Sequence, residues 1–380
     1  MQIVRNGKAD RNAPYKEEQR AVVSVHQAGR AEQLMRRCPL YERTPLHAFD
    51  ILASRLDVSR IFVKDETQRL GLTSFKALGG AHAVLLRASA SANATFATAT
   101  DGNHGISVAA GAWLSGARSV CFLPPHVQPL YADAMRLLGA KIIHTEGNYD
   151  IAVAQAARVS RENGWTLISD TTPEKFDAAS HDVLAGYGVM VGECVSQLAE
   201  LAHFEGPGGV THVFMQGGVG GLAAAFAGGF WERLGNRRPV LVIVEPRRAD
   251  CLYQSARNGE ISAATGDLNT SMGMLSCGRP SRMAWTILQS AGDFFMTIED
   301  AAASAGMHAF ATEPATGARA TTPSGAAGLA GLIEAAASAE VRQLIGLNER
   351  SVVLTVCSEQ LPNRAALEAL IASRPQAVRA

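Results

Sequence analysis

Short apolar runs alternate along the chain with alanine-rich stretches that have the composition of helices. The runs are rich in Val, Ile and Phe and have about the length of a typical strand. Clear examples are Ile61–Lys64, Ser119–Leu123 and His212–Gln216, and the first of these precedes a helix that we expect to begin near Phe75. Alternating strands and helices are typical of a parallel sheet covered by helices. The pattern therefore predicts an α/β fold.

The segment from residue 88 to residue 195 contains an alternation of its own. Its candidate strands are TFATAT, SVCFLP, KIIHT and TLISD, with helical stretches between them. We therefore predict a small α/β domain at 88–195 that is inserted into a large domain made of 1–87 and 196–380. We expect the first twenty residues and Ser373–Ala380 to be loose ends.

Composition and charge limit the classes of partner. The chain has 380 residues, of which 47% are hydrophobic and 18% are charged, which is enough for a large core in two domains. Lys and Arg together number 35, as do Asp and Glu, so nothing favours nucleic acid or an anionic membrane surface. No run approaches the roughly 20 apolar residues of a membrane span, and the polar start does not read as a signal peptide. We expect a cytoplasmic protein that binds a small molecule.

The six cysteines show neither CxxC spacing nor clustering with histidines, so we expect no metal site. Two of them, Cys251 and Cys277, flank a glycine-containing segment. A disulfide between them would close a loop, although a reducing cytosol argues against it. The sequence leaves this pairing open.

Three motifs carry the candidate chemistry: Ser74-Phe75-Lys76, Thr100–Gly105 (TDGNHG) and Gly217–Gly221 (GGVGG). Each is weak alone, but together and in this order they provide what a pyridoxal phosphate site requires. The aldehyde of this cofactor needs an amine, its ring oxygen needs a donor, and its phosphate needs a cradle of backbone N–H groups. Successive glycines at a helix N-terminus suit a single phosphate.

The same glycine loop also fits a dinucleotide fingerprint. The spacing Gly218-x-Gly220-x-x-Ala223 follows a strand, and Glu245 ends the next strand. However, the loop lies past the middle of the chain, and a nicotinamide cofactor leaves Lys76 and the TDGNHG loop unexplained. An NAD(P)-binding oxidoreductase is therefore the less favoured interpretation.

Six segments in sequence order resemble the fold-type II pyridoxal phosphate enzymes, which are similar to the tryptophan synthase β-subunit. They are RTPL at 43–46, KDETQR at 64–69, SFKALGG, TDGNHG, GGVGG and the late SVVLTVCSE. Within that group, the chain is similar to the diaminopropionate ammonia-lyase family. The similarity lies in the Asp of TDGNHG and in the segments GLTSFKALGG, EGNYD, VEPRRADCLY and MGMLSCG. The resemblance implies two open parallel-sheet domains with the active site between them, a large domain that binds the cofactor, and a homodimer.

The resemblance also implies roles for individual residues. Lys76 would form the internal aldimine, and its apolar neighbours Phe75 and Ala77 would lower its pKa by partial desolvation; the alternative is a solvated surface lysine. We expect the remaining contacts to be as follows: Asn103 with the ring 3-hydroxyl, Gly217, Gly218, Val219, Gly220 and Gly221 with the phosphate, Ser358 with the pyridine nitrogen, and Ser74, Thr100 and His104 with the substrate. For His104, a structural role that satisfies backbone groups is favoured over substrate contact.

Asp101 decides the substrate class. A carboxylate beside the cofactor could remove a Cα proton on the face opposite Lys76, so that two bases would serve two enantiomers. The alternative is that Asp101 caps the following helix. A neutral Ser358 at the ring nitrogen weakens the electron sink, which favours elimination over transamination. We therefore expect β-elimination from D- and L-2,3-diaminopropionate to pyruvate and ammonia, with a serine- or threonine-type dehydratase as the alternative and an inactive amino-acid-binding protein as a third possibility.

Overall fold

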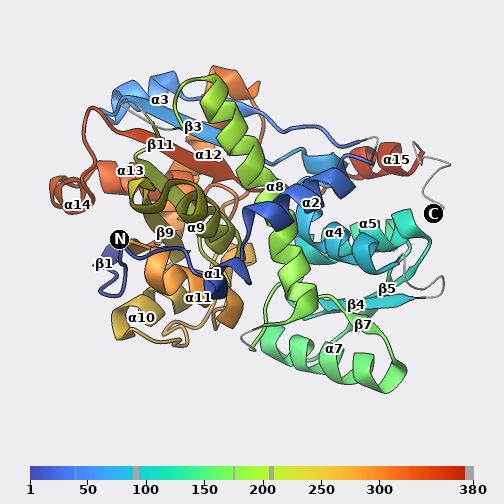
Figure 1. Ribbon diagram of the computed structural model, residues 1–380. Coiled ribbons are helices and arrows are strands. Elements are labelled where there is room, and N and C mark those ends of the chain that lie inside the picture. The colour runs from blue at the N-terminus through green and yellow to red at the C-terminus, as the bar shows by residue number, and fades with distance from the viewer. Residues whose placement is uncertain (39, 89–93, 174–175, 205–208, 373–380) are drawn as a thin grey trace.

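A computed structural model describes residues 1–38, 40–88, 94–173, 176–204 and 209–372 of the chain. Within these ranges the chain forms a seven-stranded sheet and a four-stranded sheet, each flanked by helices (Figure 1). The predicted α/β class is confirmed. In Figure 1 the smaller sheet lies at the lower right, and the long helix α8 (Ala178–Glu200) runs between the two parts.

The larger sheet has the strand order β1-β10-β9-β8-β11-β3-β2. The five central strands are parallel, and β1 and β2 pair antiparallel at the two edges. Its strands are β1 (Gln2–Arg5), β2 (Leu46–Ala48), β3 (Arg60–Asp65), β8 (His212–Gln216), β9 (Val240–Pro246), β10 (Phe294–Ile298) and β11 (Val352–Cys357). Every residue of β8, β10 and β11 is buried, as expected for parallel strands that helices cover on both faces.

Alternate side chains of the larger sheet enter two different cores. In β8, Val213 and Met215 face one core whereas Phe214 faces the other, because successive side chains point to opposite faces of a strand. The first core contains α2 (Val25–Met35), α8, α9 (Gly221–Leu234) and α11 (Arg282–Ala291). The second contains α3 (Asp50–Arg55), α12 (Asp300–Thr312), α13 (Ala327–Ala336) and α14 (Ala339–Ile345).

The smaller sheet is parallel throughout, with the order β6-β5-β4-β7. Its strands are β4 (Thr95–Ala99), β5 (Arg118–Leu123), β6 (Lys141–His144) and β7 (Thr166–Leu167). The four predicted strands TFATAT, SVCFLP, KIIHT and TLISD correspond to β4 to β7. Helices α5 (Asn103–Ser115) and α6 (Pro129–Leu137) cover one face, and α7 (Tyr149–Asn163) covers the other.

Helix α4 (Lys76–Ala88) carries Lys76 at its first position and packs closely on α5. A Cβ atom on Gly80 would lie 2.8 Å from Ser107 Oγ, and one on Gly111 would lie 2.9 Å from Ala81 Cα. The Ser107 hydroxyl also accepts a hydrogen bond of 2.8 Å from the Ala81 N–H. Gly80 of SFKALGG and Gly111 of α5 therefore allow the two helices to touch, and this contact holds α4 beside the smaller sheet.

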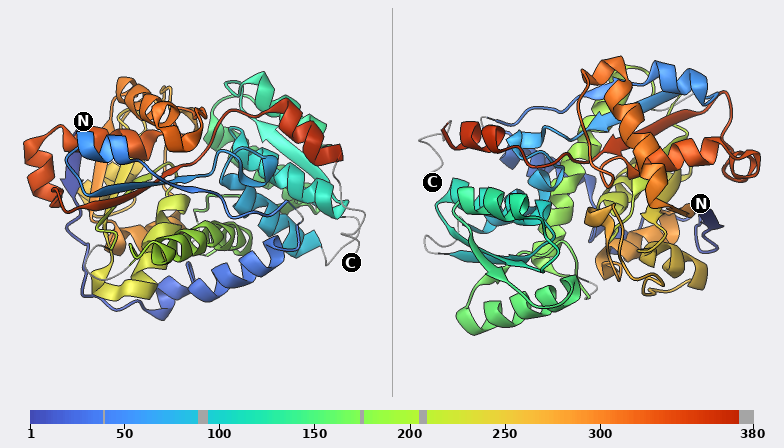
Figure 2. Two further views of the ribbon diagram at one scale, coloured as in Figure 1. Left: turned by 90° about the horizontal axis from the view of Figure 1, so that it is seen from above. Right: turned by 180° about the vertical axis from the view of Figure 1, so that it is seen from behind.

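The remaining helices are short. They are α1 (Glu17–Arg20), α10 (Cys251–Asn258), α15 (Arg364–Ala372) and the 3₁₀ turns η1 (Arg69–Gly71), η2 (Gly235–Arg237), η3 (Gly273–Leu275) and η4 (Pro314–Thr316). Figure 2 shows α15 against the part of the molecule that contains the smaller sheet, and α15 contacts α6 there. No helix within the described ranges is long and apolar enough to cross a membrane.

The expectation that the first twenty residues are loose is wrong. Residues Gln2–Arg5 form an edge strand on β10, and Asn6, which is 4% exposed, donates to Gly292 O at 2.8 Å. Tyr15 is buried, and its hydroxyl donates to Val23 O at 2.6 Å. The polar composition of this segment concealed these anchors. Residues 373–380 lie outside the described residues.

The predicted division into 1–87 with 196–380 and 88–195 remains a prediction. The two sheets fall on either side of it, but α4 packs on α5 although its residues belong to the predicted large domain. A boundary after residue 195 would also fall inside α8, which continues to Glu200.

Candidate active site

One pocket lies where strands of both sheets end. Residues that follow β4, β7, β8 and β11 line it, together with the start of α4 and the loop around Cys277. It encloses about 770 Å³, counting its open mouth. The carboxyl ends of parallel strands are the usual ligand site of open α/β sheets. The pocket brings together these predicted residues: Lys76, Thr100, Asp101, Asn103, His104, Gly217, Gly218, Val219, Gly221 and Ser358.

Two predicted residues do not line this pocket. The Ser74 side chain is buried, and its hydroxyl accepts a hydrogen bond of 3.2 Å from the Lys76 N–H at the start of α4. Gly220 is the N-cap residue of α9. Both therefore shape neighbouring backbone, and the substrate contact expected for Ser74 stays a prediction.

The loop before Lys76 is conformationally unusual. Leu70 and Thr73 have φ angles of 52° and 63°, in the left-handed region that non-glycine residues rarely adopt. Such conformations persist only where the surroundings hold them, and they gather at functional sites. The loop begins at Arg69, whose guanidinium is fully buried.

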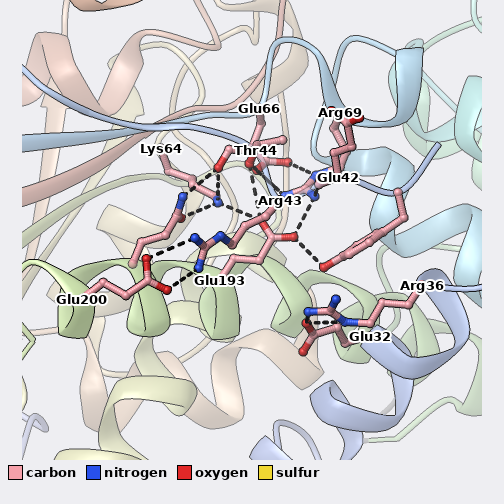
Figure 3. A network of polar contacts seen from close by, with 12 residues as sticks. Glu32, Arg36, Glu42, Arg43, Thr44, Lys64, Glu66, Arg69, Glu193 and Glu200 are labelled. Carbon is pink, nitrogen blue, oxygen red and sulfur yellow. Dashed lines mark hydrogen bonds and ion pairs between the residues drawn. The ribbon is translucent and has the colours of Figure 1, made fainter. Parts of the chain in front are cut away.

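A buried ionic network holds Arg69 (Figure 3). Arg69 donates to Glu66 at 2.7 Å and to Glu193 of α8 at 2.7 Å, and Lys64 donates to Glu193 at 2.7 Å. All four side chains are at most 1% exposed. Two cations and two anions therefore balance in the interior, and the KDETQR segment is fixed to α8 next to the Lys76 loop.

Lys76 forms an ion pair with Asp170, a residue that we did not anticipate. The distance from Lys76 Nζ to Asp170 Oδ2 is 2.5 Å, and the two side chains are 19% and 10% exposed. The rings of Phe75 and Tyr187 lie 5.3 and 5.7 Å from Nζ, within range of cation–π attraction. Lys76 is therefore not a solvated surface lysine.

The expected lowering of the Lys76 pKa is wrong. Burial is the largest single effect and lowers this pKa, but the adjacent Asp170 carboxylate and Tyr187 together raise it more, so the net shift is upward. Burial alone would raise the pKa of Asp170, and the Lys76 ammonium reverses this so that the pKa is lowered. The sequence showed the apolar neighbours at 75 and 77 but not the distant carboxylate, which reaches Lys76 from the end of β7.

Thr100 shapes the TDGNHG loop from within. Its hydroxyl accepts from the N–H groups of Gly102 and Gly105 at 3.0 and 2.9 Å. The N-cap residue of α5 is Gly102, and no side chain caps it. The alternative that Asp101 caps this helix is therefore wrong. Asp101 instead faces the pocket and bonds His126 Nε2 at 3.0 Å.

Asn103 and His104 begin α5 inside the pocket. Asn103 Nδ2 donates to Glu359 Oε2 at 2.6 Å, while its buried Oδ1 has no partner among the described residues. Burial raises the pKa of Glu359 to about 7, against the lowering effect of its bonds from Thr322 and Asn103. His104 Nε2 lies 3.1 Å from Ile168 O. Burial lowers the pKa of His104, and the ring donates from Nε2 to this carbonyl, which ties α5 to the segment after β7.

The glycine loop joins β8 to α9. Its Gly218 and Gly220 have φ angles of 64° and 96°, and a Cβ on Gly217 would lie 2.5 Å from Glu245 Cγ. Gly217 and Gly220 use their N–H groups within the fold, on Val244 O and Gly217 O. Within the described ranges, the N–H groups of Gly218, Val219 and Gly221 have no acceptor. Three donors without an acceptor thus lie at the N-terminus of a 14-residue helix, whose dipole favours an anion.

Glu245 does not serve a dinucleotide. It is fully buried under the glycine loop and accepts from the N–H groups of Leu252 and Tyr253 at 3.0 and 2.7 Å. Burial raises its pKa to about 8. Its carboxyl group caps α10, so no ribose can reach it. The oxidoreductase interpretation therefore lacks the acidic residue that would bind the ribose.

Comparison with known proteins identifies the family. Residues 38–358 match the family described as pyridoxal-phosphate dependent enzyme. This chain belongs to that family. Diaminopropionate ammonia-lyase of Escherichia coli (strain K12) is 34% identical over 361 residues, 88% of this chain and 89% of the relative. The same enzyme of Salmonella typhimurium (strain LT2) is 35% identical over 72% of each chain.

A solved structure agrees with the sequence match. Diaminopropionate ammonia-lyase from E. coli, in complex with an aminoacrylate-PLP azomethine reaction intermediate, superposes with a TM-score of 0.85 at 31% identity and covers 97% of this chain and 96% of that chain. The predicted fold-type II class and cofactor are confirmed. Pyridoxal phosphate is the cofactor, and the chain is a lyase of this family.

The pocket fits pyridoxal phosphate on its own geometry. It offers an amine at Lys76, three unengaged N–H groups at a helix terminus for a phosphate, and Ser358 in its wall. Ser358 follows β11, where its carbonyl accepts from the Phe75 N–H at 3.0 Å. The roles of the single residues remain predictions.

The two cysteines whose pairing was left open are both free thiols. Cys277 lines the pocket. Cys251 is buried, and its Sγ lies 3.6 Å from Gly218 O and 3.6 Å from Glu245 Oε1. Cys251 therefore supports the underside of the glycine loop.

Asp170, Glu359 and Tyr187 are among the pocket residues that escaped the sequence analysis. Asp170 ends the segment TLISD, which we predicted as a strand, and Glu359 follows Ser358 directly. Polar residues at the carboxyl ends of parallel strands are candidates for a site, and this signal could have found both acids. Tyr187 lies inside the apolar helix α8 and gave no signal.

Proposed function

We propose that this chain is an ammonia-lyase that converts 2,3-diaminopropionate, in its D and L forms, to pyruvate and two ammonia. One observation carries the proposal: a single pocket places Lys76 in contact with the carboxylate of Asp170 and also contains the carboxylate of Asp101. The similarity to diaminopropionate ammonia-lyases over 88% of the chain supports the same substrate.

The proposed roles follow from position in the pocket. Bound pyridoxal phosphate supplies an aldehyde that bonds amines and a ring that withdraws electrons from Cα. Lys76 would provide the amine, and Gly218, Val219 and Gly221 would donate their N–H groups to the phosphate. Asn103 would donate to the ring oxygen, for which its amide must leave Glu359, and Ser358 would contact the ring nitrogen.

The charge of the pocket favours a diamino acid. When Lys76 gives up its positive charge, the Asp170 carboxylate loses its cationic partner. The side chain of Asp170 is only 10% exposed. A buried carboxylate without a partner is unstable by several kcal/mol. The β-ammonium group of 2,3-diaminopropionate can replace the lysine cation, whereas serine and threonine offer only a neutral hydroxyl. This difference favours the ammonia-lyase over the dehydratase.

Two bases are available in the proposed site. Lys76 would take the Cα proton of one enantiomer, and Asp101 would take that of the other. Burial raises the pKa of Asp101, with His126 opposing the shift. A carboxylate with a raised pKa is a better proton acceptor at neutral pH than an ordinary one. Thr100 and His104 support the loop between these groups and would lie beside the substrate.

A substrate panel tests the proposal. Purified protein with pyridoxal phosphate is mixed with D- and L-diaminopropionate, serine, threonine and β-substituted alanines, and pyruvate (2-oxobutyrate for threonine) and ammonia are measured. We expect two ammonia per pyruvate and the highest kcat/KM for diaminopropionate. A higher kcat/KM for serine or threonine would support the dehydratase instead.

We further propose that the enzyme is a cytoplasmic homodimer that degrades amino acids. The resemblance to fold-type II enzymes and the absence of membrane-length helices from the described residues support this. Light scattering coupled to size-exclusion chromatography measures the mass directly, and a mass of one chain would contradict the dimer.

A further inference from the structure

Asp101 has a partner on the neighbouring strand connection. Strands β4 and β5 are parallel neighbours, with Ala99 opposite Phe122. Asp101 follows β4 and His126 follows β5, so both lie at the carboxyl edge of the smaller sheet. His126 Nε2 is 3.0 Å from Asp101 Oδ1. Of the described residues, His126 alone bonds the Asp101 side chain.

The two members of this pair face different surroundings. The Asp101 side chain is 16% exposed and lines the active-site pocket, whereas the His126 side chain is 56% exposed. Both also line an adjoining cavity of about 700 Å³, counting its open mouth, which shares Ser324 and Glu359 with the active-site pocket. The imidazole therefore connects the buried carboxylate with solvent.

Packing holds the connection after β5 against the TDGNHG loop. Tyr131 of α6 lies against Gly102, the residue after Asp101, so closely that a Cβ on Gly102 would lie 2.5 Å from Tyr131 Cδ1. Pro129 begins α6 just after His126 and restricts its backbone there. The fold thus holds the start of α6, just after His126, beside the loop that carries Asp101.

The charges around Asp101 make this contact significant. The groups that face Asp101 from the other elements are Lys76 of α4, Asp170 after β7, Tyr149 of α7 and Cys277 after η3, with Glu359 in the shared cavity wall. Asp170 repels the Asp101 charge, and Lys76 is already engaged by Asp170. His126 is consequently the basic side chain that is bonded to Asp101, and the Asp101 carboxylate raises the pKa of His126.

We propose that His126 is a positioning residue and a proton outlet for Asp101. The imidazole holds the carboxylate toward the pocket in its ionised form and carries the proton that Asp101 collects out to solvent. This inference rests on the proposed function, in which Asp101 removes the Cα proton of the D-substrate.

The proton balance closes with these two residues and water. When Asp101 takes the Cα proton, the C–H bond breaks, its electron pair stays with the substrate, and an O–H bond forms. The O–H bond then breaks as neutral His126 accepts the proton at Nε2, which restores the carboxylate. The exposed imidazolium finally releases one proton to water. Each turnover thus moves one proton from substrate to solvent.

Kinetics on both enantiomers test the outlet. We expect His126→Ala to lower kcat on the D-substrate on the order of tenfold, less than the 10²–10⁴ typical of a direct base. The acid limb of its kcat/KM profile should move to higher pH, because Asp101 loses the group that lowers its pKa. The L-substrate should be affected less. Imidazole added to the solution should restore D-activity to His126→Ala but not to His126→Gln, whose amide fills the site and cannot titrate. His26→Ala, at another exposed histidine, is the control.

A spectroscopic titration tests the pair without turnover. Histidine Cε1–H signals of the ¹³C-labelled holoenzyme are followed against pH, and His126→Gln identifies the His126 signal. We expect the His126 pKa to fall clearly in Asp101→Asn. An unchanged His126 titration, or equal losses on both enantiomers without rescue by imidazole, would overturn the inference. If the wild type released no pyruvate from diaminopropionate, the proposed function would fail, and the titration would still decide whether the pair is coupled.

Discussion

Replacing Glu193 by Gln removes one charge from the buried network that secures the Lys76 loop. Glu193 Oε2 accepts from Lys64 and Arg69, each at 2.7 Å, and Oε1 accepts from Arg69 at 2.8 Å and from Tyr41 at 2.7 Å. Gln has nearly the same size, but its amide presents an NH₂ group to donors where the carboxylate presented an acceptor. The substitution therefore disrupts the charge balance without leaving a cavity.

The expected cost follows from burial. Lys64, Arg69 and Glu66 are all 0% exposed, so the variant leaves two cations and one anion in the interior. Removing one partner of a buried ion pair costs about 3–5 kcal/mol. This is a large part of the roughly 5–15 kcal/mol by which a native protein is stable. The loop with the unusual φ angles at Leu70 and Thr73 should loosen as well.

Equilibrium unfolding in urea measures this effect at pH 7. The matched control is Glu162→Gln, which breaks the Arg158–Glu162 pair, whose side chains are 58% and 54% exposed. Exposed pairs of this kind contribute about 0–1 kcal/mol. If Glu193→Gln unfolded within 1 kcal/mol of the wild type, the network would not hold the fold.

The stability of the same variant should depend on pH differently from that of the wild type. Burial tends to raise the pKa of Glu193, but Arg69 and Lys64 outweigh it and hold the pKa below that of an unfolded glutamate. The ionised Glu193 therefore contributes stability above pH of about 4.5 and loses it as the pH falls toward the folded pKa. We expect the difference between the wild type and Glu193→Gln to narrow below about pH 4.5. A constant difference would contradict the assigned charge.

Three further predictions concern the cofactor. Lys76→Ala should abolish the absorbance of lysine-bound cofactor and nearly all turnover, unlike the exposed-site control Lys141→Ala; retained absorbance and rate would refute the role of Lys76. Gly218→Val should weaken cofactor affinity at least about tenfold, or ~1.4 kcal/mol, because a Cβ is strained at φ 64° beside the three N–H donors. Equilibrium dialysis measures the affinity, with Gly7→Val as the control. An unchanged affinity would show that the phosphate binds elsewhere. Asp170→Asn should lower the pKa of Lys76, so that the acid limb for cofactor association moves down by about one pH unit or more; no movement would contradict the ion pair.

Much of the fold follows from local pattern. The strands at 95–99, 118–123 and 212–216 are apolar runs of strand length, so their composition alone identifies them. The N-terminal strand was missed because Gln2–Arg5 is short and half polar, and because its partner β10 lies about 290 residues away along the chain. Pairing over such a separation leaves no periodic signal.

The residues of the site also differ in whether the sequence alone could place them. Lys76, Asn103 and the glycine loop lie in motifs whose residue types are tied to one chemistry, so they could be placed in advance. The pairing of Asp170 with Lys76 could not be placed in advance, because it joins residues that are 94 positions apart in the chain. For the same reason the sequence predicted a lowered lysine pKa where the pair raises it. Local neighbours are visible in a sequence, whereas charges brought from other strands are not.

Asp101→Asn tests the central claim most directly, since it keeps the size of the side chain and removes the base. Pyruvate release from D- and L-diaminopropionate is measured for the wild type and the variant at saturating pyridoxal phosphate. We expect elimination from the D-form to fall by a factor on the order of 10²–10⁴, the usual effect of losing a positioned base, and elimination from the L-form to fall much less. Equal losses on both enantiomers would contradict a site in which Lys76 and Asp101 act as two separate bases.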